Sequence, residues 1–250
     1  MKKIVVANWM MNPTTPREAK ALAQKTKVLA SKLKQSHIIV CPPAVFISLL
    51  KSTPRLSLGA QDVSLEAGEG AFTGELSAAM LAYSGAEFTL IGHSERRAKG
   101  ETNEMVNKKV KLALAARLKT IICLGEDKRD EHGHYLEPLR QQVKKALTGL
   151  IKPDLKRVII AYEPVWAVGR AAKSADTPAD FLHHALFISK TLSDLFDKKL
   201  AMQVPIIYGG SVDSKNAEGF LKAGQADGLL VGRASLNPDE LKKILYVAEN

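Results

Sequence analysis

VIIAYEPVWAVGRAAKSA, residues 158–175, is the stretch around which the chain is organised. Its first part, Val158–Tyr162, is an apolar run that predicts a buried strand. Glu163 stands at the end of this strand, and Pro164 stops it, because proline cannot donate to a ladder of backbone hydrogen bonds. A carboxylate at the end of a strand, followed by an apolar loop, suits a base beneath a lid. For an isolated Glu-Pro the alternative is a surface glutamate beside a turn, and the rest of the chain decides between the two.

Short apolar runs rich in β-branched residues recur along the chain, separated by segments with a helical pattern. We expect strands at Lys3–Asn8, His37–Cys41, Leu58–Gln61, Phe88–Gly92, Thr120–Leu124, Val158–Tyr162, Val204–Tyr208 and Gly228–Val231. Near-continuous apolar strands that alternate with amphipathic helices indicate a parallel sheet covered on both faces. Eight such units in 250 residues, with no linker between them, favour an α/β fold: a (β/α)8 barrel in a single domain, residues 1–250.

Three short segments carry the signals that begin a helix. Thr15-Pro16, Thr177-Pro178 and Asn237-Pro238 each place a capping residue before a proline, and acidic residues follow in the next turn. A side chain of this kind pairs with free backbone N–H groups, and proline suits the first helical position. We therefore expect helices after the first, sixth and eighth strands.

Composition and charge limit the classes of function. Hydrophobic residues make up 46% and charged residues 25% of the chain, as in globular proteins. The N-terminus does not resemble a signal peptide and no apolar run has the length of a membrane span, so we expect a cytoplasmic protein without a membrane partner. The net charge of +10 raises nucleic-acid binding as an alternative, but the lysines are spread singly over predicted helices, and we expect no nucleic-acid partner. Cys41 and Cys123, far apart in apolar runs, favour buried thiols over a disulfide.

Polar and glycine-rich segments follow several of the predicted strands. In barrels of this kind the active site lies at the C-terminal ends of the strands. At these positions the chain carries Asn8–Asn12, Gly92–Arg97, Glu163, Gly209–Ser211 and Gly232–Ser235, after the first, fourth, sixth, seventh and eighth strands. We expect these segments to meet at one rim of the barrel.

Glu163 and His93 would face each other across this rim. A carboxylate base and an imidazole hydrogen-bond donor suit proton abstraction next to a carbonyl, with the developing oxyanion held by the imidazole. For His93 alone the alternative is a structural histidine. The spacing of histidine, cysteine and aspartate does not suit zinc, and we expect no metal. The glycine-rich turns after the seventh and eighth strands would point backbone N–H groups at an anion. One such turn alone is more often a simple tight turn, but two on adjacent strands of a barrel favour the anion site.

Five segments resemble the signature segments of the triosephosphate isomerase family. They are ANWMMN (7–12), GHSERR (92–97), AYEPVWAVG (161–169), YGGS (208–211) and DGLLVGRASL (227–236). With CPP at 41–43 and GAFTGE at 70–75, the resemblance covers the whole chain. It implies that the protein interconverts dihydroxyacetone phosphate and glyceraldehyde 3-phosphate, in glycolysis and gluconeogenesis, without a cofactor.

Carried over by position, the resemblance implies a role for most of the polar residues at the rim. Glu163 is the base that moves the proton between two carbons, and His93 is a neutral electrophile that polarises the carbonyl, as this family pairs them. A short helix that begins near Ser94 disfavours protonation of the imidazole. Asn8 contacts the substrate oxygen, and Glu95 belongs to the polar network behind it. The phosphate is held by backbone N–H groups near Gly169, Gly210, Ser211, Gly232 and Arg233.

Two further segments resemble moving or protruding parts of the family's structure. The family's lid excludes water when it closes, and its two hinges match Pro164, Val165 and Trp166 at one end and Lys173, Ser174 and Ala175 at the other. GAFTGE resembles the loop that inserts into a neighbouring subunit, with Thr73 at its tip. The resemblance thus implies a homodimer whose pocket is completed across the interface.

Position 10 departs from the family pattern. The family has a lysine after Asn-Trp, where this chain has Met10. Methionine has a similar length and an unbranched stem, so the shape of the pocket is kept while a positive charge that faces the phosphate is lost. Loss of one preorganised electrostatic partner lowers a rate by about 10²–10³-fold, and we therefore expect strongly reduced activity.

Two arginines near the predicted phosphate site also depart from the family. Arg170 follows Gly169 where the family usually has Gly-Thr-Gly, and Arg233 follows Gly232 where it usually has Gly-Gly. Either guanidinium could replace part of the missing charge, although neither lies at the end of the first strand. Three hypotheses remain: an isomerase, natural or altered at position 10; a non-catalytic relative that binds triose phosphates or a protein partner; and a basic barrel associated with nucleic acid.

Overall fold

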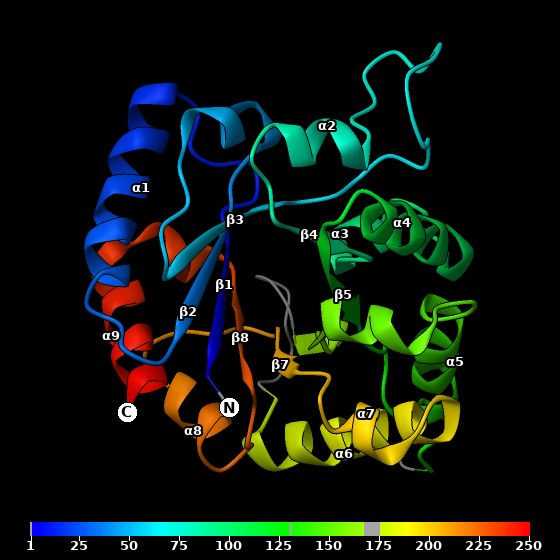
Figure 1. Cartoon of the computed structure of the whole chain (residues 1–250). Coiled ribbons are helices and arrows are strands. Elements are labelled where there is room, and N and C mark those ends of the chain that lie inside the picture. The colour runs from blue at the N-terminus through cyan, green and yellow to red at the C-terminus, as the bar shows by residue number, and fades with distance from the viewer. Residues whose placement is uncertain (1, 131, 168–175) are drawn as a thin grey trace.

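The computed structural model describes residues 2–130, 132–167 and 176–250, and its strands form a closed parallel barrel (Figure 1). Each strand pairs with the next in the sequence, and β8 pairs with β1 from Ile4 opposite Gly228 to Ala7 opposite Val231. The strands are β1 (Ile4–Asn8), β2 (His37–Cys41), β3 (Leu56–Ala60), β4 (Phe88–Ile91), β5 (Lys119–Leu124), β6 (Val158–Tyr162), β7 (Ile206–Tyr208) and β8 (Gly228–Val231). The predicted (β/α)8 barrel is confirmed.

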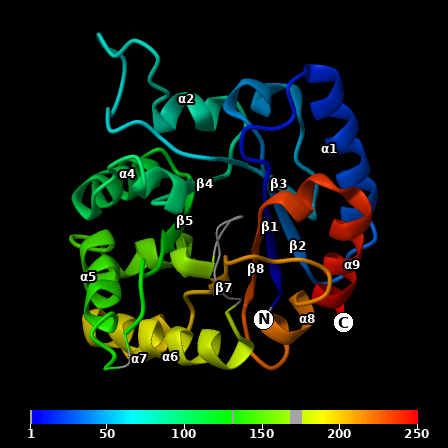
Figure 2. The same cartoon turned by 180° about the vertical axis from the view of Figure 1, so that it is seen from behind.

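Helices surround the barrel, as the two opposite views show (Figures 1 and 2). The α-helices are α1 (Pro16–Ala30), α2 (Ala78–Tyr83), α3 (Ser94–Arg97), α4 (Asn103–Ala115), α5 (Leu136–Ala146), α6 (Pro178–Leu195), α7 (Lys198–Ala201), α8 (Ala217–Leu221) and α9 (Pro238–Glu249). The 3-10 helices are η1 (Ala44–Leu49), η2 (Lys152–Arg157), η3 (Val165–Ala167) and η4 (Arg233–Leu236).

The predicted helix starts are confirmed by their caps. The hydroxyl of Thr15 accepts the N–H of Glu18, whose carboxylate in turn accepts the N–H of Thr15. Thr177 caps α6 through the N–H of Asp180, and Asn237 caps α9 in the same way.

Two strands begin two residues away from the positions that the sequence pattern predicts, whereas β1 and β5 begin one residue away, at Ile4 and Lys119. β3 begins at Leu56, earlier than the expected Leu58, because it pairs with β2 from Ile38 opposite Leu56 onward. β7 begins at Ile206, later than the expected Val204. The N–H of Val204 still donates to Ala201 in the turn after α7, and Pro205 has no N–H to donate.

The core has two parts because successive side chains of a strand point to opposite faces. One cluster, which includes Val6, Ile39, Leu90, Ile121 and Leu230, takes alternate residues of the strands and fills the barrel. The larger cluster takes the intervening residues and packs against the helices. The thiols of Cys41 and Cys123 are free and buried in the barrel interior, as expected, and burial raises the pKa of both. Within the described ranges, no helix is both long and apolar enough to cross a membrane.

Candidate active site

A cavity of about 640 Å³ lies at the C-terminal ends of the strands, where the sequence predicts the functional rim. The described residues that line it are Asn8, Met10, His93, Glu95, Gly209, Gly210, Ser211, Val212, Asp213, Leu230, Gly232, Arg233, Ala234 and Glu240. The structure thus brings together segments that follow β1, β4, β7 and β8. Glu163 is not among the lining residues, because its carboxylate is turned toward α3.

The backbone after β4 fixes the orientation of His93. Gly92 turns the chain with a φ of 76°, and the side chain of Arg97 holds this turn by donating to the carbonyl of Gly92 at 2.8 Å. His93 then caps α3, with the N–H of Glu95 donating to Nδ1 at 3.2 Å. Since Nδ1 accepts this bond, the proton of the neutral ring is on Nε2.

Nε2 of His93 faces the centre of the rim. It lies 3.4 Å from Nδ2 of Asn8 and 3.5 Å from Oε1 of Glu163. The amide oxygen of Asn8 accepts the N–H of Met10, so the Asn8 amide presents its nitrogen to the ring. Two N–H donors therefore converge on one spot, where a carbonyl oxygen of a substrate could accept from both.

Glu163 is 2% exposed and only partly satisfied. Its Oε2 accepts the backbone N–H of Ser94 at 3.1 Å, whereas its buried Oε1 has no hydrogen-bond partner in the described part of the chain. A buried carboxylate oxygen without a donor is unusual in a purely structural role. This oxygen is free to accept a proton from a bound molecule.

Gly209 makes room for the carboxylate, a role that the sequence analysis did not assign to it. A Cβ at Gly209 would lie 2.8 Å from Cγ of Glu163, closer than side chains pack. The only signal in the sequence was the Gly-Gly pair, which we interpreted as an anion-binding turn. Gly209 thus makes room for the predicted base, whereas Gly210 belongs to the predicted anion-binding turn.

The loops after β7 and β8 form the other end of the cavity. The N–H groups of Gly210, Ser211, Gly232 and Arg233 donate to no acceptor among the residues that the structure covers. Ser211 also ties its loop to η3, because its hydroxyl donates to the carbonyl of Ala167 at 2.9 Å. Unpaired N–H groups gathered at adjacent strand ends are suited to an anion such as a phosphate.

Met10 holds a backbone conformation that is rare for residues other than glycine. Its φ is 54°, and it is held from both sides: its N–H donates to Asn8, and its carbonyl accepts from Nε2 of Gln61 at 2.7 Å. Cε of Met10 lies 3.8 Å from the position of a Cβ on Gly232, so the thioether ends at the anion end of the cavity. The sequence pattern places Gln61 at the end of the third strand, and no local signal indicates this contact with Met10.

Glu126, which the sequence analysis also missed, binds the predicted first hinge. Its carboxylate accepts the hydroxyl of Tyr162 at 2.9 Å, the indole N–H of Trp166 at 2.8 Å and Nε of Arg129 at 2.9 Å. Trp166 and Val165 belong to η3, directly after Pro164. The segment after β6 is therefore fixed by a buried carboxylate on the segment after β5.

Arg129 connects the two edges of the predicted lid. Its guanidinium lies over the ring of Trp166, 4.3 Å from the centroid, and donates to Asp176 at 3.2 Å. Burial raises the pKa of Asp176 to about 6. The remaining predicted lid positions, Gly169, Arg170, Lys173, Ser174 and Ala175, lie outside the described residues.

Two other predicted positions lie at the surface. The side chain of Glu95 is 65% exposed, with its carboxylate 3.9 Å from Nδ1 of His93 at the edge of the cavity. Thr73 is exposed on the loop of residues 66–76, which extends away from the barrel at the top of Figure 1. Thr73 does not contribute to the cavity of its own chain.

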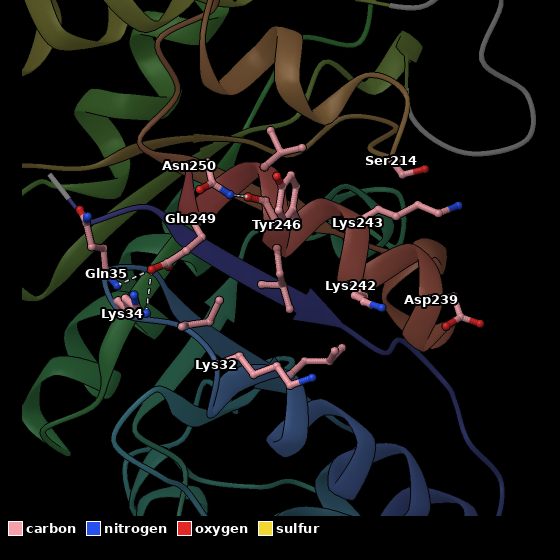
Figure 3. A pocket seen from close by; sticks show the side chains of 14 residues that line it. Lys32, Lys34, Gln35, Ser214, Asp239, Lys242, Lys243, Tyr246, Glu249 and Asn250 are labelled. Carbon is pink, nitrogen blue, oxygen red and sulfur yellow. Dashed lines mark hydrogen bonds between the residues drawn. The ribbon is translucent and has the colours of Figure 1, made fainter.

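A second cavity, of about 960 Å³, lies between α1 and α9 and is lined by several lysines (Figure 3). Two acidic residues, Asp239 and Glu249, line it, and Glu249 is used structurally, because it accepts the backbone N–H groups of Lys34, Gln35 and Ser36. No histidine lines it, and within the described ranges it presents no paired base and electrophile. The cavity at the strand ends is therefore the candidate active site.

Comparisons with known proteins agree with this geometry. A family model described as Triosephosphate isomerase matches residues 3–248. The triosephosphate isomerase of Dictyoglomus turgidum is 39% identical over 250 residues, which cover 98% of both chains. Those of Citrifermentans bemidjiense and Caldanaerobacter subterraneus subsp. tengcongensis are each 41% identical, over 99% and 98% of both chains. This chain belongs to the triosephosphate isomerase family.

Proposed function

We propose that this protein interconverts dihydroxyacetone phosphate and D-glyceraldehyde 3-phosphate, in glycolysis and gluconeogenesis. The observation that carries the proposal is the pair formed by His93 and Glu163. Nε2 of His93 lies 3.5 Å from a buried Glu163 oxygen that has no other partner among the described residues. Family membership supports the substrate, and the unpaired N–H groups of the β7 and β8 loops support a phosphate at the other end of the cavity.

The reaction needs one base and one electrophile. The Glu163 carboxylate takes a proton from the carbon next to the substrate carbonyl. The electron pair of the broken C–H bond forms a C=C bond, and the π pair of the carbonyl moves to its oxygen. The carbonyl oxygen gains the negative charge and accepts hydrogen bonds from His93 Nε2 and Asn8 Nδ2, which forms an enediolate. Glu163 then returns the proton to the neighbouring carbon, and the proton on the oxygens is exchanged through His93.

Glu163 must first leave the Ser94 N–H to reach this position. We propose that closure of the lid moves it, since Glu163 immediately precedes Pro164 and η3. Pro164, Val165 and Trp166 are then the first hinge, braced by Glu126, and the segment that ends at Ala175 is the second. Closure excludes water, which strengthens the electrostatic contacts around the enediolate.

Met10 weakens the anion end of this site. Its thioether reaches toward Gly232 but contributes no charge to a phosphate bound by the Gly210, Ser211 and Gly232 loops. Glu95 lines the same cavity, and Met10 offers its carboxylate no positive charge. Turnover should therefore be strongly reduced compared with a chain that has lysine at this position.

We also propose that two copies of the chain form a homodimer. Six large apolar side chains are 44% to 94% exposed: Phe72 and Leu76 on the 66–76 loop, Met80 and Tyr83 on α2 directly after it, and Met11 and Val45 after β1 and β2. Exposed apolar side chains that gather on one face are typical of a protein interface. The loop with Thr73 would insert beside the partner's site. A single-domain chain in the cytoplasm fits the free, buried thiols of Cys41 and Cys123.

A coupled isomerase assay on the chain and on Met10→Lys tests the proposed function. Because the lysine adds a preorganised charge next to the phosphate, we expect kcat/KM to rise by about 10²–10³-fold. Met10→Leu is the matched control: it keeps an apolar side chain and should leave kcat/KM within about threefold. If Met10→Lys folds but turnover stays at background, the isomerase function fails, and a non-catalytic relative remains.

A further inference from the structure

The charges that line the active-site cavity are unsuited to an anion, except at one residue. Three carboxylates line it, on Glu95, Asp213 and Glu240, and of these Glu240 also pairs with Lys243 at 2.9 Å. Among the described lining residues, Arg233 is the only lysine or arginine. Of the side chains that the structure describes around this cavity, a phosphate dianion would meet one cationic group, Arg233, at the end where the unpaired N–H groups lie.

Arg233 is placed to reach a bound anion. It is the first residue of η4 and directly follows Gly232, against which the tip of Met10 lies. Arg233 is not among the described residues with positive φ, so the backbone here does not require the glycine that the family usually has. Its side chain is exposed and can therefore turn toward the cavity without displacing buried side chains.

Three other arginines near the rim already bind groups of the protein. Arg96 pairs with Asp62 at 2.8 Å, Arg97 holds the carbonyl of Gly92, and Arg129 holds Glu126 and Asp176. By contrast, the guanidinium of Arg233 makes no hydrogen bond, ion pair or aromatic contact with any residue that the structure describes. A guanidinium without a protein partner retains all of its donors for a ligand.

We propose that Arg233 is the cation that binds the phosphate group of the substrate in this chain, in place of the lysine that the family has at position 10. The proposal rests on the proposed function, in that the substrate is a triose phosphate. A planar guanidinium can donate two parallel hydrogen bonds to a phosphate, a geometry that an ammonium group does not offer. Because the Arg233 side chain is exposed, ordering it on a phosphate costs side-chain entropy.

This assignment predicts a specific kinetic signature. The phosphate keeps its charge throughout the isomerisation, so a contact to it stabilises the bound substrate and the transition state equally. Loss of such a contact raises KM and leaves kcat nearly unchanged. A merely structural role of Arg233 would instead lower the melting temperature and leave KM unchanged.

Calorimetric titration with glycerol 3-phosphate tests the proposal without turnover, since this triose phosphate analogue has no carbonyl and cannot isomerise. We expect Arg233→Ala to weaken its binding about tenfold or more, and Arg233→Lys to restore part of the loss. The matched control is Lys215→Ala, which removes one exposed positive charge from the neighbouring β7–α8 loop outside the cavity and should change the affinity by less than about twofold. If Arg233→Ala binds as tightly as the parent chain, or the parent chain does not bind at all, the proposal is overturned.

The same substitution in a Met10→Lys background separates the proposal from the proposed function. With lysine at position 10 supplying charge, Arg233→Ala should raise KM by only about twofold, because two cations at one phosphate act non-additively. Equal losses in both backgrounds would overturn the replacement of one cation by the other. Activity in Met10→Lys together with unchanged binding by Arg233→Ala would leave the isomerase function standing and remove only the assignment of Arg233.

Discussion

The two ends of the active-site cavity hold their polar groups by different means. At the reacting end, Glu163 is 2% exposed and takes a backbone N–H, and the ring of His93 is fixed through Nδ1 by its own helix. At the anion end, the N–H groups are set by loop backbones, while Arg233 is exposed and Met10 contributes only a thioether. Chemistry at the first end requires fixed atoms, whereas binding at the second requires charge that several positions could supply.

This difference explains why the departures from the family pattern lie where they do. A substitution at Glu163 or His93 would remove an atom to which we assign a part in proton transfer, and no described neighbour offers a replacement. A substitution at position 10 removes a charge, and electrostatic attraction to a dianion depends on distance and solvent exposure more than on one atom's position. Different loops at the anion end can therefore supply the positive charge, whereas the residues of the reacting end must stay the same.

Glu163→Gln should have the largest effect at the reacting end. The amide can still accept the Ser94 N–H, but it cannot take a proton, so kcat should fall by about 10²–10⁴-fold. Binding of glycerol 3-phosphate should remain within about twofold, because its phosphate lies at the other end. Turnover and calorimetry on the same Met10→Lys background give enough signal for both measurements. A loss of binding as large as the loss of turnover would contradict the separation of the two ends.

Gly209→Ala tests the geometry of the base rather than its chemistry. The added methyl would lie 2.8 Å from Cγ of Glu163 and must displace the carboxylate. A displacement of about 1 Å at a reacting group costs up to about 10²-fold, and we expect kcat to fall by about 10–10² while the affinity for glycerol 3-phosphate changes by less than about threefold. The melting temperature serves as the control for folding. An unchanged kcat in a folded variant would show that Glu163 reacts from a position that Gly209 does not shape.

Sequence reasoning located the reacting end because it depends on a rule about strand ends. Parallel strands bring their C-terminal ends to one rim, so Asn8, His93 and Glu163 could be placed together from their positions after apolar runs. The supporting contacts do not follow from any such rule. Gln61 reaches the carbonyl of Met10, and Arg129 reaches Asp176, through side-chain conformations that depend on packing between segments distant in sequence.

The strand boundaries show the same limit on a smaller scale. Leu56 joins β3 because its neighbour β2 offers a partner at that position, although the local apolar pattern begins only at Leu58. Conversely, Val204 is a β-branched residue of the kind that strands favour, but its N–H donates to the carbonyl of Ala201 in the turn after α7. Hydrogen-bond partners decided both boundaries, from the neighbouring strand for Leu56 and from the preceding turn for Val204, rather than local propensity.

At the edge of the predicted lid, the buried carboxylate of Asp176 faces Arg129, which also donates to Glu126. Burial raises the pKa of Asp176 to about 6, although the guanidinium of Arg129 lies 3.2 Å away and lowers it. In the unfolded chain an aspartate has a pKa of about 3.9. The folded state therefore binds a proton more tightly, and the contribution of Asp176 to stability is largest at low pH. It is lost progressively as the pH rises from about 4 to about 6, and it stays constant above that range.

Asp176→Asn should remove this contribution to the pH dependence. Between about pH 4 and pH 6 the midpoint of urea unfolding of the parent chain should fall relative to that of the variant, with the difference level from about pH 7 upward. Asp180→Asn is the matched control, since Asp180 faces the same guanidinium at 3.7 Å but is 46% exposed. It should shift the midpoint by a similar amount at every pH, through the cap of α6. If Asp176→Asn follows the parent chain across the whole range, the buried carboxylate does not titrate there. The ion pair with Arg129 would then offset the effect of burial on the pKa of Asp176.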